Sequence, residues 1–106
     1  MTVAQAAGLR AALRVGYHLL DRGGSALTAV EQAIRVLEQS GLFNAGAGSR
    51  LQLDGVRRMD ASIMEGDSLR AGAVASVEGI AHPIVAARLV METTDHVMLV
   101  GPLATK

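Results

Sequence analysis

The sequence predicts a mixed α/β (α+β) domain, in which helices and short strands follow one another without repeated strand-helix-strand units. The order of the periodic segments supports this class, because two helical segments precede the extended runs, a third helix and a final extended run. Composition supports it as well, since half of the 106 residues are hydrophobic but only Tyr17 and Phe43 are aromatic. A core of aliphatic side chains and methionine suits close-packed helix and sheet layers.

Two amphipathic helices are predicted first. Apolar residues recur at helical spacing from about Gln5 to Asp21, and the glycine pair at 23–24 can close this helix. The second helix begins either after Ser25 as N-cap or one turn later, where Thr28 and Glu31 have the spacing of a capping box. We predict Ser25, which gives the longer helix. Its expected apolar face consists of Val30, Ala33, Ile34 and Leu37.

A glycine-rich loop and a hairpin are predicted next. Residues 41–49 are rich in Gly, Ala, Asn and Ser, which favours a loop with unusual backbone angles. Leu51 and Leu53 then alternate with polar neighbours, and Asp54–Gly55 suits a type I′ turn. We therefore predict a β-hairpin whose second extended run begins at Val56.

The last third of the chain predicts a strand, a helix and a strand. Residues 69–77 are typical of a strand rich in small residues, and Pro83 suits the first position of a helix that ends near Glu92. Residues 96–100 predict a short buried strand. No linker or internal repeat divides the chain, so we expect one domain over residues 1–106.

Charge and cysteine content exclude several classes of function. The formal net charge is zero and Lys and Arg form no cluster, so we expect neither nucleic acid nor a membrane surface as a partner. No apolar stretch reaches the roughly 18 residues of a membrane span, and the N-terminus does not resemble a signal peptide. The absence of cysteine excludes disulfides and thiolate metal sites. We expect a cytoplasmic protein.

The glycine loop and the histidines offer alternatives that the spacing does not favour. Gly46-Ala47-Gly48 could cradle a phosphate, but no third glycine has the dinucleotide spacing and no Lys-Ser/Thr follows. We predict a structural turn and keep an anion site as the alternative. His18, His82 and His96 lie far apart in sequence, so we expect hydrogen-bonded or solvated side chains instead of metal ligands.

Two aspartates and two arginines lie around the predicted hairpin. Asp54 is explained by its turn, whereas Asp60 interrupts the apolar end of a strand over residues 59–64. A buried carboxylate there must accept several hydrogen bonds, so Asp60 either pins a loop backbone or orients a catalytic group, and we favour the structural role. Arg57 and Arg58 are expected to face solvent or to pair locally.

Six ordered motifs carry a family resemblance: GGSALTAVEQAIRVLE (23–38), FNAGAGS (43–49), DG (54–55), MDASIMEG (59–66), LRAGAVASV (69–77) and HPIVAARLVMETTDHVMLVG (82–101). Together they resemble the α-subunit of plant-type L-asparaginase/isoaspartyl peptidase, a family of threonine-dependent N-terminal nucleophile (Ntn) hydrolases. The resemblance implies an αββα sandwich and a precursor that cleaves itself to free a threonine at the start of a β-subunit. That threonine attacks a side-chain amide or isopeptide carbonyl, with its own α-amino group as the base.

The resemblance also assigns roles to residues of this chain. Asn44 is expected beside the nucleophile, and Gly46, Gly48 and Asp60 are expected to be structural. The family's sodium ion, bound by backbone carbonyls, stiffens the loop, and oxygen ligands suit such a hard cation. Those carbonyls map onto Leu37, Glu38, Ser40, Phe43, Ala45 and Ala47. No organic cofactor is implied, and the complete enzyme is expected to be an (αβ)2 assembly acting on asparagine or an isoaspartyl peptide.

The chain departs from the family pattern at both ends. The family's first strand, with its His-Gly-Gly stretch, is absent before the first helix, and no Thr-Val-Gly cleavage motif precedes Lys106. The threonines are Thr2, Thr28, Thr93, Thr94 and Thr105. Only Thr2 could become N-terminal, by loss of Met1, but a helix-like sequence follows it. We therefore expect an incomplete, α-subunit-like domain that is inactive alone. The alternative is a non-catalytic relic or interaction module with an exposed sheet edge.

Overall fold

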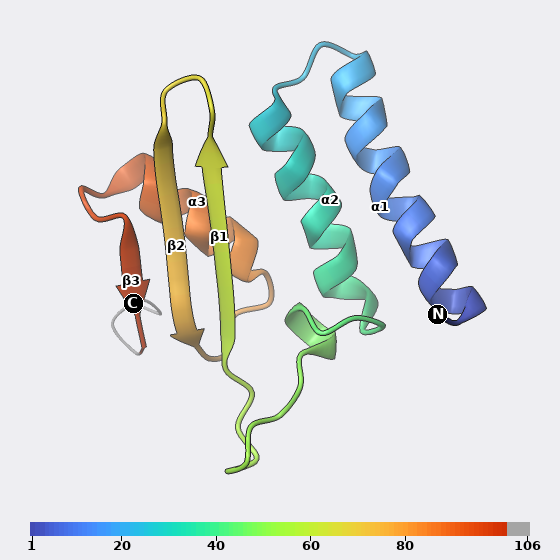
Figure 1. Cartoon of the computed structure of the whole chain (residues 1–106), viewed down its shortest axis with the longest axis vertical. Helices are drawn as coiled ribbons and strands as arrows, with labels where there is room; N and C mark the ends of the chain where they lie inside the picture. Colours follow the sequence, from blue (N-terminus) through green and yellow to red (C-terminus); the bar gives the residue numbers. More distant parts are fainter. Residues whose placement is uncertain (102–106) are drawn as a thin grey trace.

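The computed structural model describes residues 1–101, which form three α-helices, one short 3-10 turn and a three-stranded sheet. Helices α1 (Val3–Asp21) and α2 (Ala26–Ser40) pack as an antiparallel pair at the N-terminal side (Figure 1). The 3-10 turn η1 (Gly46–Gly48) lies in the loop that leads from α2 to the sheet. Strands β1 (Met59–Glu65), β2 (Arg70–Val77) and β3 (Met98–Val100) form the sheet, and helix α3 (Pro83–Thr93) connects β2 to β3. The predicted mixed α/β class is therefore found.

The ends of the first two helices follow from capping. Thr2 and Gln5 form a reciprocal capping box, so α1 begins two residues before its predicted start. The Ser25 hydroxyl accepts the Thr28 N–H, which confirms Ser25 as the N-cap of α2. Gly41 has a φ of +74° and ends α2.

The predicted hairpin at Asp54–Gly55 is wrong. A turn does form there, because the Asp54 carboxylate accepts the Val56 N–H at 3.0 Å and the Gln52 N–H donates to the Val56 carbonyl at 2.9 Å. No strand precedes this turn, and Leu53 projects fully into solvent. The run after the turn becomes a strand only at Met59, which confirms the predicted strand over residues 59–64 but not its start at Val56. The hairpin instead joins β1 to β2 through the turn at residues 66–69.

The sheet has the order β1-β2-β3, with β1 antiparallel and β3 parallel to β2. The β2-α3-β3 segment is therefore a single strand-helix-strand crossover; the sequence analysis predicted its three elements but not their parallel pairing. The predicted strand at 96–100 is confirmed only over Met98–Val100, and those residues are partly or largely exposed. The molecule measures 38 × 37 × 17 Å, which matches one helix layer on one sheet layer.

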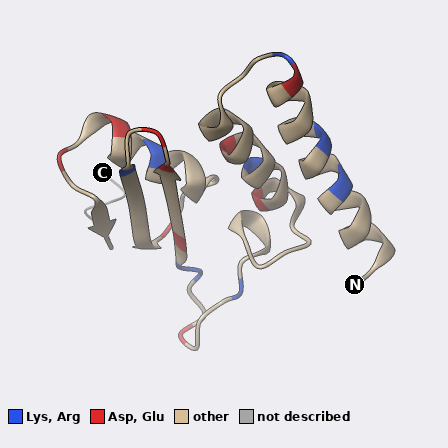
Figure 2. Cartoon of the chain, turned by 45° about the horizontal axis from the view of Figure 1, so that its top comes forward, with Lys and Arg blue, Asp and Glu red and all other residues tan. Residues whose placement is uncertain are grey.

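The core lies between α3 and one face of the sheet. It contains Leu27, Met59, Ile63, Val74, Val77, Ile84, Ala87, Val90 and Met91. The opposite face of the sheet is uncovered, and charged residues lie at the strand ends instead of along their middle (Figure 2). Met64 and Met98 on that face are 59% and 53% exposed. The α1 helix likewise leaves Leu13 and Leu20 exposed, so much of its predicted apolar face has no partner within residues 1–101.

Candidate functional site

The loop between α2 and β1 forms the candidate site, because it turns back against the last turn of α2. The Ala45 N–H donates to the Phe43 carbonyl at 2.7 Å, and the Gly48 N–H donates to the Ala45 carbonyl at 3.1 Å. The Ser49 N–H closes the short turn η1 on the Gly46 carbonyl at 3.0 Å. These bonds give the loop a defined shape without a regular strand or helix.

Gly46 and Gly48 lie where no side chain fits. Gly46 has a φ of +54°, and a Cβ atom there would lie 2.6 Å from both the Cβ atom and the carbonyl oxygen of Glu38. A Cβ atom on Gly48 would lie 2.2 Å from the Phe43 carbonyl oxygen. Gly46 therefore allows the loop to pack directly on the backbone of α2, and Gly48 allows the loop to fold closely on its own residues Gly41 and Phe43.

Asn44 is exposed, and one side of its amide is held in place. Its Oδ1 atom accepts the Arg50 N–H at 2.8 Å. Because a backbone N–H requires an oxygen acceptor, this bond fixes which atom of the amide is oxygen. The amide NH2 group makes no hydrogen bond within residues 1–101, so it can donate to a group that lies against the loop.

Asp60 is exposed, so the expectation of a buried carboxylate is wrong. Its Oδ1 atom accepts the Ser76 N–H at 2.9 Å, and Ser76 has a φ of +53°. The register shifts here, since Met59 pairs with Val77 but Ala61 pairs with Val74. Asp60 thus stabilises a β-bulge across the hairpin. Strand alternation directs Asp60 to the open face of the sheet, which explains its exposure.

A cavity of about 300 Å³ separates the loop from the start of β1. Its polar lining residues are Glu38, Asn44, Ser49, Arg58, Asp60 and Ser62. The structure therefore brings Asn44, Gly46 and Asp60 to one cavity, whereas Gly48 is absent from its lining. Within residues 1–101 no threonine lines this cavity.

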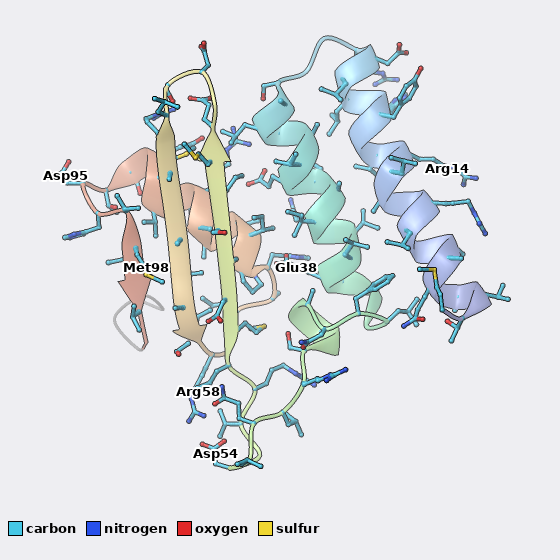
Figure 3. The ribbon with its side chains drawn as sticks, in the orientation of Figure 1. Arg14, Glu38, Asp54, Arg58, Asp95 and Met98 are labelled. Atoms are coloured by element: carbon cyan, nitrogen blue, oxygen red, sulfur yellow. The ribbon has the colours of Figure 1, made fainter. Side chains whose placement is uncertain are left out.

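Sequence reasoning missed the buried carboxylates of α2. Glu38 is 3% exposed, and its Oε1 and Oε2 atoms lie 3.1 Å from His82 Nδ1 and the Ile84 backbone nitrogen (Figure 3). Glu31 is 9% exposed and lies 3.4 Å from Arg88. The sequence could have indicated this burial, because positions 27, 31, 34 and 38 recur at helical spacing and therefore lie on one face of α2. The predicted face was partly wrong, since Val30 is 45% exposed.

The six carbonyls assigned to sodium belong to the last turn of α2 and to the loop. The Leu37 carbonyl accepts the Ser40 hydroxyl at 2.8 Å, and the Phe43 and Ala45 carbonyls accept loop N–H groups. A carbonyl oxygen has two lone pairs, so these bonds leave capacity for a cation. Within residues 1–101 no group of three His, Asp or Glu side chains could hold a metal. A sodium ion on these carbonyls stays a prediction from the resemblance.

Charged residues near the start of β1 pair locally, as predicted. Arg58 lies 2.9 Å from Asp54 and 3.0 Å from Glu78, and Arg57 donates to the Ser49 carbonyl (Figure 3). The Val56 N–H, together with Arg58, lowers the pKa of Asp54 below its ordinary value. The hydrogen bond with Asp54 raises the pKa of Arg58. Both groups are partly exposed, so they shape the connection more than they stabilise the fold.

Comparisons with known proteins assign the family. A family model described as Asparaginase matches residues 1–106. The plant-type L-asparaginase of Pyrococcus horikoshii is 57% identical over 99 residues, which cover 93% of this chain and 32% of that protein. The isoaspartyl peptidase/L-asparaginase of Xenopus laevis is 54% identical over 99 residues, with the same coverage of 93% and 32%. The isoaspartyl peptidase of Salmonella typhimurium is 50% identical over 86 residues, or 81% and 28% of the two chains.

This chain belongs to the asparaginase family, and it resembles plant-type L-asparaginases and isoaspartyl peptidases at 50% to 57% identity. It spans about a third of the length of the curated relatives it matches, at 32% of the first one. No helix within residues 1–101 combines the length and the apolar character needed to cross a membrane.

Proposed function

We propose that this chain is the α-subunit part of an enzyme that hydrolyses the side-chain amide of L-asparagine and β-aspartyl bonds of isoaspartyl peptides. The observation that carries the proposal is the 57% identity to a plant-type L-asparaginase over 99 residues, which include the loop at 43–49. The cavity between that loop and β1 is the proposed position of the reacting groups.

In this proposal the nucleophile is a threonine of a β-subunit, freed by self-cleavage of a precursor. Its hydroxyl oxygen attacks the amide carbon, its α-amino group takes the hydroxyl proton, and ammonia or a peptide amine leaves. Water then hydrolyses the acyl-enzyme ester. The threonines of residues 1–101 support an external nucleophile, because Thr2 caps α1 and the Thr93 and Thr94 hydroxyls donate to backbone carbonyls of α3. Thr28 accepts a hydrogen bond from Arg88.

Asn44 and the loop supply support for that chemistry. The NH2 group of Asn44 would donate to the nucleophile while Arg50 holds its oxygen. A sodium ion on the carbonyls of the loop would lower the mobility of Asn44. The all-oxygen donor set, which is supplied by the backbone, is what supports sodium here.

The surface supports a β-subunit as the partner. Strand β1 is an edge strand, and it lies beside α2 (Figure 1). An unpaired edge offers N–H and C=O groups to an added strand, and the small residues of the open sheet face allow a second sheet to approach. A β-subunit would complete an αββα sandwich in this way, and the complete enzyme would be an (αβ)2 assembly.

A complementation assay tests the function. The purified chain alone should release no ammonia from L-asparagine and no aspartate from a β-aspartyl dipeptide. Coexpression with the part of the Pyrococcus horikoshii relative that lies outside the matched region should restore both activities.

Variants sharpen this assay. Asn44→Ala should lower the restored kcat by about tenfold or more, by analogy with the loss of one preorganised hydrogen-bond donor. Asp67→Asn, in the exposed β1–β2 turn, serves as the control and should leave the rate unchanged. Turnover by the chain alone would refute its inactivity, and an assembled complex without amidase activity would refute the proposed function.

A further inference from the structure

Glu38 is the most buried carboxylate within residues 1–101, at 3% exposure. It lies on the last turn of α2 and points toward the start of α3 (Figure 3). A carboxylate near the C-terminal end of its own helix is opposed by the dipole of that helix. Its burial at this position therefore requires partners from elsewhere in the fold.

The start of α3 supplies those partners. The N-cap residue of α3 is His82, whose side chain makes no capping hydrogen bond. Glu38 replaces that cap, because its Oε2 atom accepts the Ile84 N–H at 3.1 Å. Its Oε1 atom lies 3.1 Å from His82 Nδ1. The Glu38 side chain on α2 thus accepts a hydrogen bond from the first turn of α3, at a residue 46 positions further along the chain.

The backbone of Glu38 also lies against the loop at residues 43–49. Gly46 packs against Glu38 so closely that a Cβ atom on the glycine would lie 2.8 Å from the Glu38 Cα atom. Glu38 also lines two cavities, one with Asn44 and Asp60, and one with His82. A displacement of Glu38 would therefore move the loop relative to β1.

We infer that Glu38 is a positioning residue, whose carboxylate fixes the loop at 43–49 by joining the last turn of α2 to the first turn of α3. Its consequence for catalysis rests on the proposed function, because it acts through Asn44. A glutamine amide has one acceptor oxygen and no charge, so Glu38→Gln weakens the bond from the Ile84 N–H and loses any bond that a protonated His82 Nδ1 donates.

Glu38→Gln tests this inference, with Glu31→Gln as the matched control. Glu31 lies two turns earlier on the same helix stripe, is 9% exposed and also meets a donor from α3, at 3.4 Å. Amide hydrogen exchange, followed by NMR in the free chain, should accelerate about tenfold at Gly48, Ser49 and Arg50 in Glu38→Gln. In Glu31→Gln the same amides should change by less than about twofold, even where the melting temperature falls equally.

Unchanged loop amides in a folded Glu38→Gln variant, or equal acceleration in both variants, would overturn the inference. Should Glu38→Gln fail to fold, His82→Ala takes its place, because alanine can neither cap α3 nor bind Glu38, so the variant keeps the Ile84 bond and removes only one partner of the carboxylate. Loop exchange in that variant should exceed the exchange in Glu31→Gln, and no excess overturns the inference.

The assembled enzyme gives a separate readout. There Glu38→Gln should lower kcat more than it changes KM, which a general loss of stability does not predict. A complex without hydrolytic activity whose loop amides still respond to Glu38→Gln contradicts the proposed function and supports the positioning role.

Discussion

At the scale of single residues, glycines and polar side chains determine the site. Gly46 has a φ of +54°, and a Cβ atom on it would lie only 2.6 Å from the Glu38 carbonyl oxygen. Asn44 and Asp60 each accept one backbone N–H, from Arg50 and Ser76. The site is therefore held by backbone geometry, with few side chains directed at one another.

Gly46→Ala should destabilise the chain by about 1–3 kcal/mol, because alanine resists this φ and its Cβ atom overlaps Glu38. Gly66→Ala is the control, since its Cβ atom would meet nothing within 4 Å. Urea unfolding should place the control within about 0.5 kcal/mol of the native chain. Equal stability of the two variants would contradict the packing of the loop on α2.

Asp54 should make the stability depend on pH at the acidic end. Its pKa is lowered in the folded chain by the Val56 N–H and by Arg58, so ionised Asp54 favours the folded state. This contribution is complete above the unfolded-state pKa of about 3.9 and is lost as the pH falls through the lower folded-state pKa. In melting curves from about pH 5 to 2, Asp54→Asn should flatten the acidic decline. An unchanged profile would contradict the pairing.

At the scale of elements, the sequence predicted helices better than strand pairing. Ser25 caps α2 and Pro83 begins α3. Both could be predicted, because an N-cap hydrogen bond and the missing N–H of proline involve only residues nearby in the sequence. A turn at Asp54–Gly55 was predicted correctly, but its type I′ geometry was not, because Asp54 lacks the positive φ that this type requires. A hairpin also needs a buried face, and Leu51 and Leu53 remain 61% and 110% exposed. Only the tertiary fold determines which extended run pairs, so the β1–β2 hairpin could not be predicted from turn residues.

The candidate site was likewise predicted where the local sequence determines it, and not where the tertiary fold does. The glycine loop could be recognised from its composition, whereas the burial of Glu38 depends on α3, which is distant in sequence. Asp60 was expected to be buried because it interrupts an apolar run. Strand alternation reversed that expectation, since the residue lies on the open face opposite Met59 and Ile63.

Contact between α3 and β2 depends on Gly72. A Cβ atom there would lie 2.2 Å from the Ala87 carbonyl oxygen and 2.7 Å from the Met91 nitrogen. Gly72→Ala should therefore move α3 off the sheet and cost about 3 kcal/mol. Ala73→Ser, on the opposite face of the same strand, should change stability by less than about 0.5 kcal/mol. Thermal unfolding of both variants checks this, and equal melting temperatures would contradict the close approach.

At the scale of the whole molecule, uncovered apolar surface is the main feature. Helix α1 exposes Leu13 at 73%, Tyr17 at 70% and Leu20 at 52%, and the sheet exposes Met98 at 53%. On α1, Leu13, Tyr17 and Leu20 recur at helical spacing, and such a row of exposed apolar side chains suits contact with a partner. Both the α-subunit proposal and the alternative of a non-catalytic interaction module account for it, but they differ in the partner.

The free chain should therefore associate with itself, and charged side chains introduced on the uncovered surface should prevent this association. The double variant Leu13→Lys and Met98→Lys should be monomeric in light scattering at concentrations where the native chain is not, with a melting temperature unchanged within a few degrees. Addition of the complementary part of the Pyrococcus horikoshii relative should convert the native chain, but not the variant, into a defined complex. A native chain that stays monomeric at all concentrations and melts cooperatively would contradict the interaction-module alternative. Self-association that the complementary part does not disperse would favour that alternative over the α-subunit proposal, because the surface would then select copies of itself.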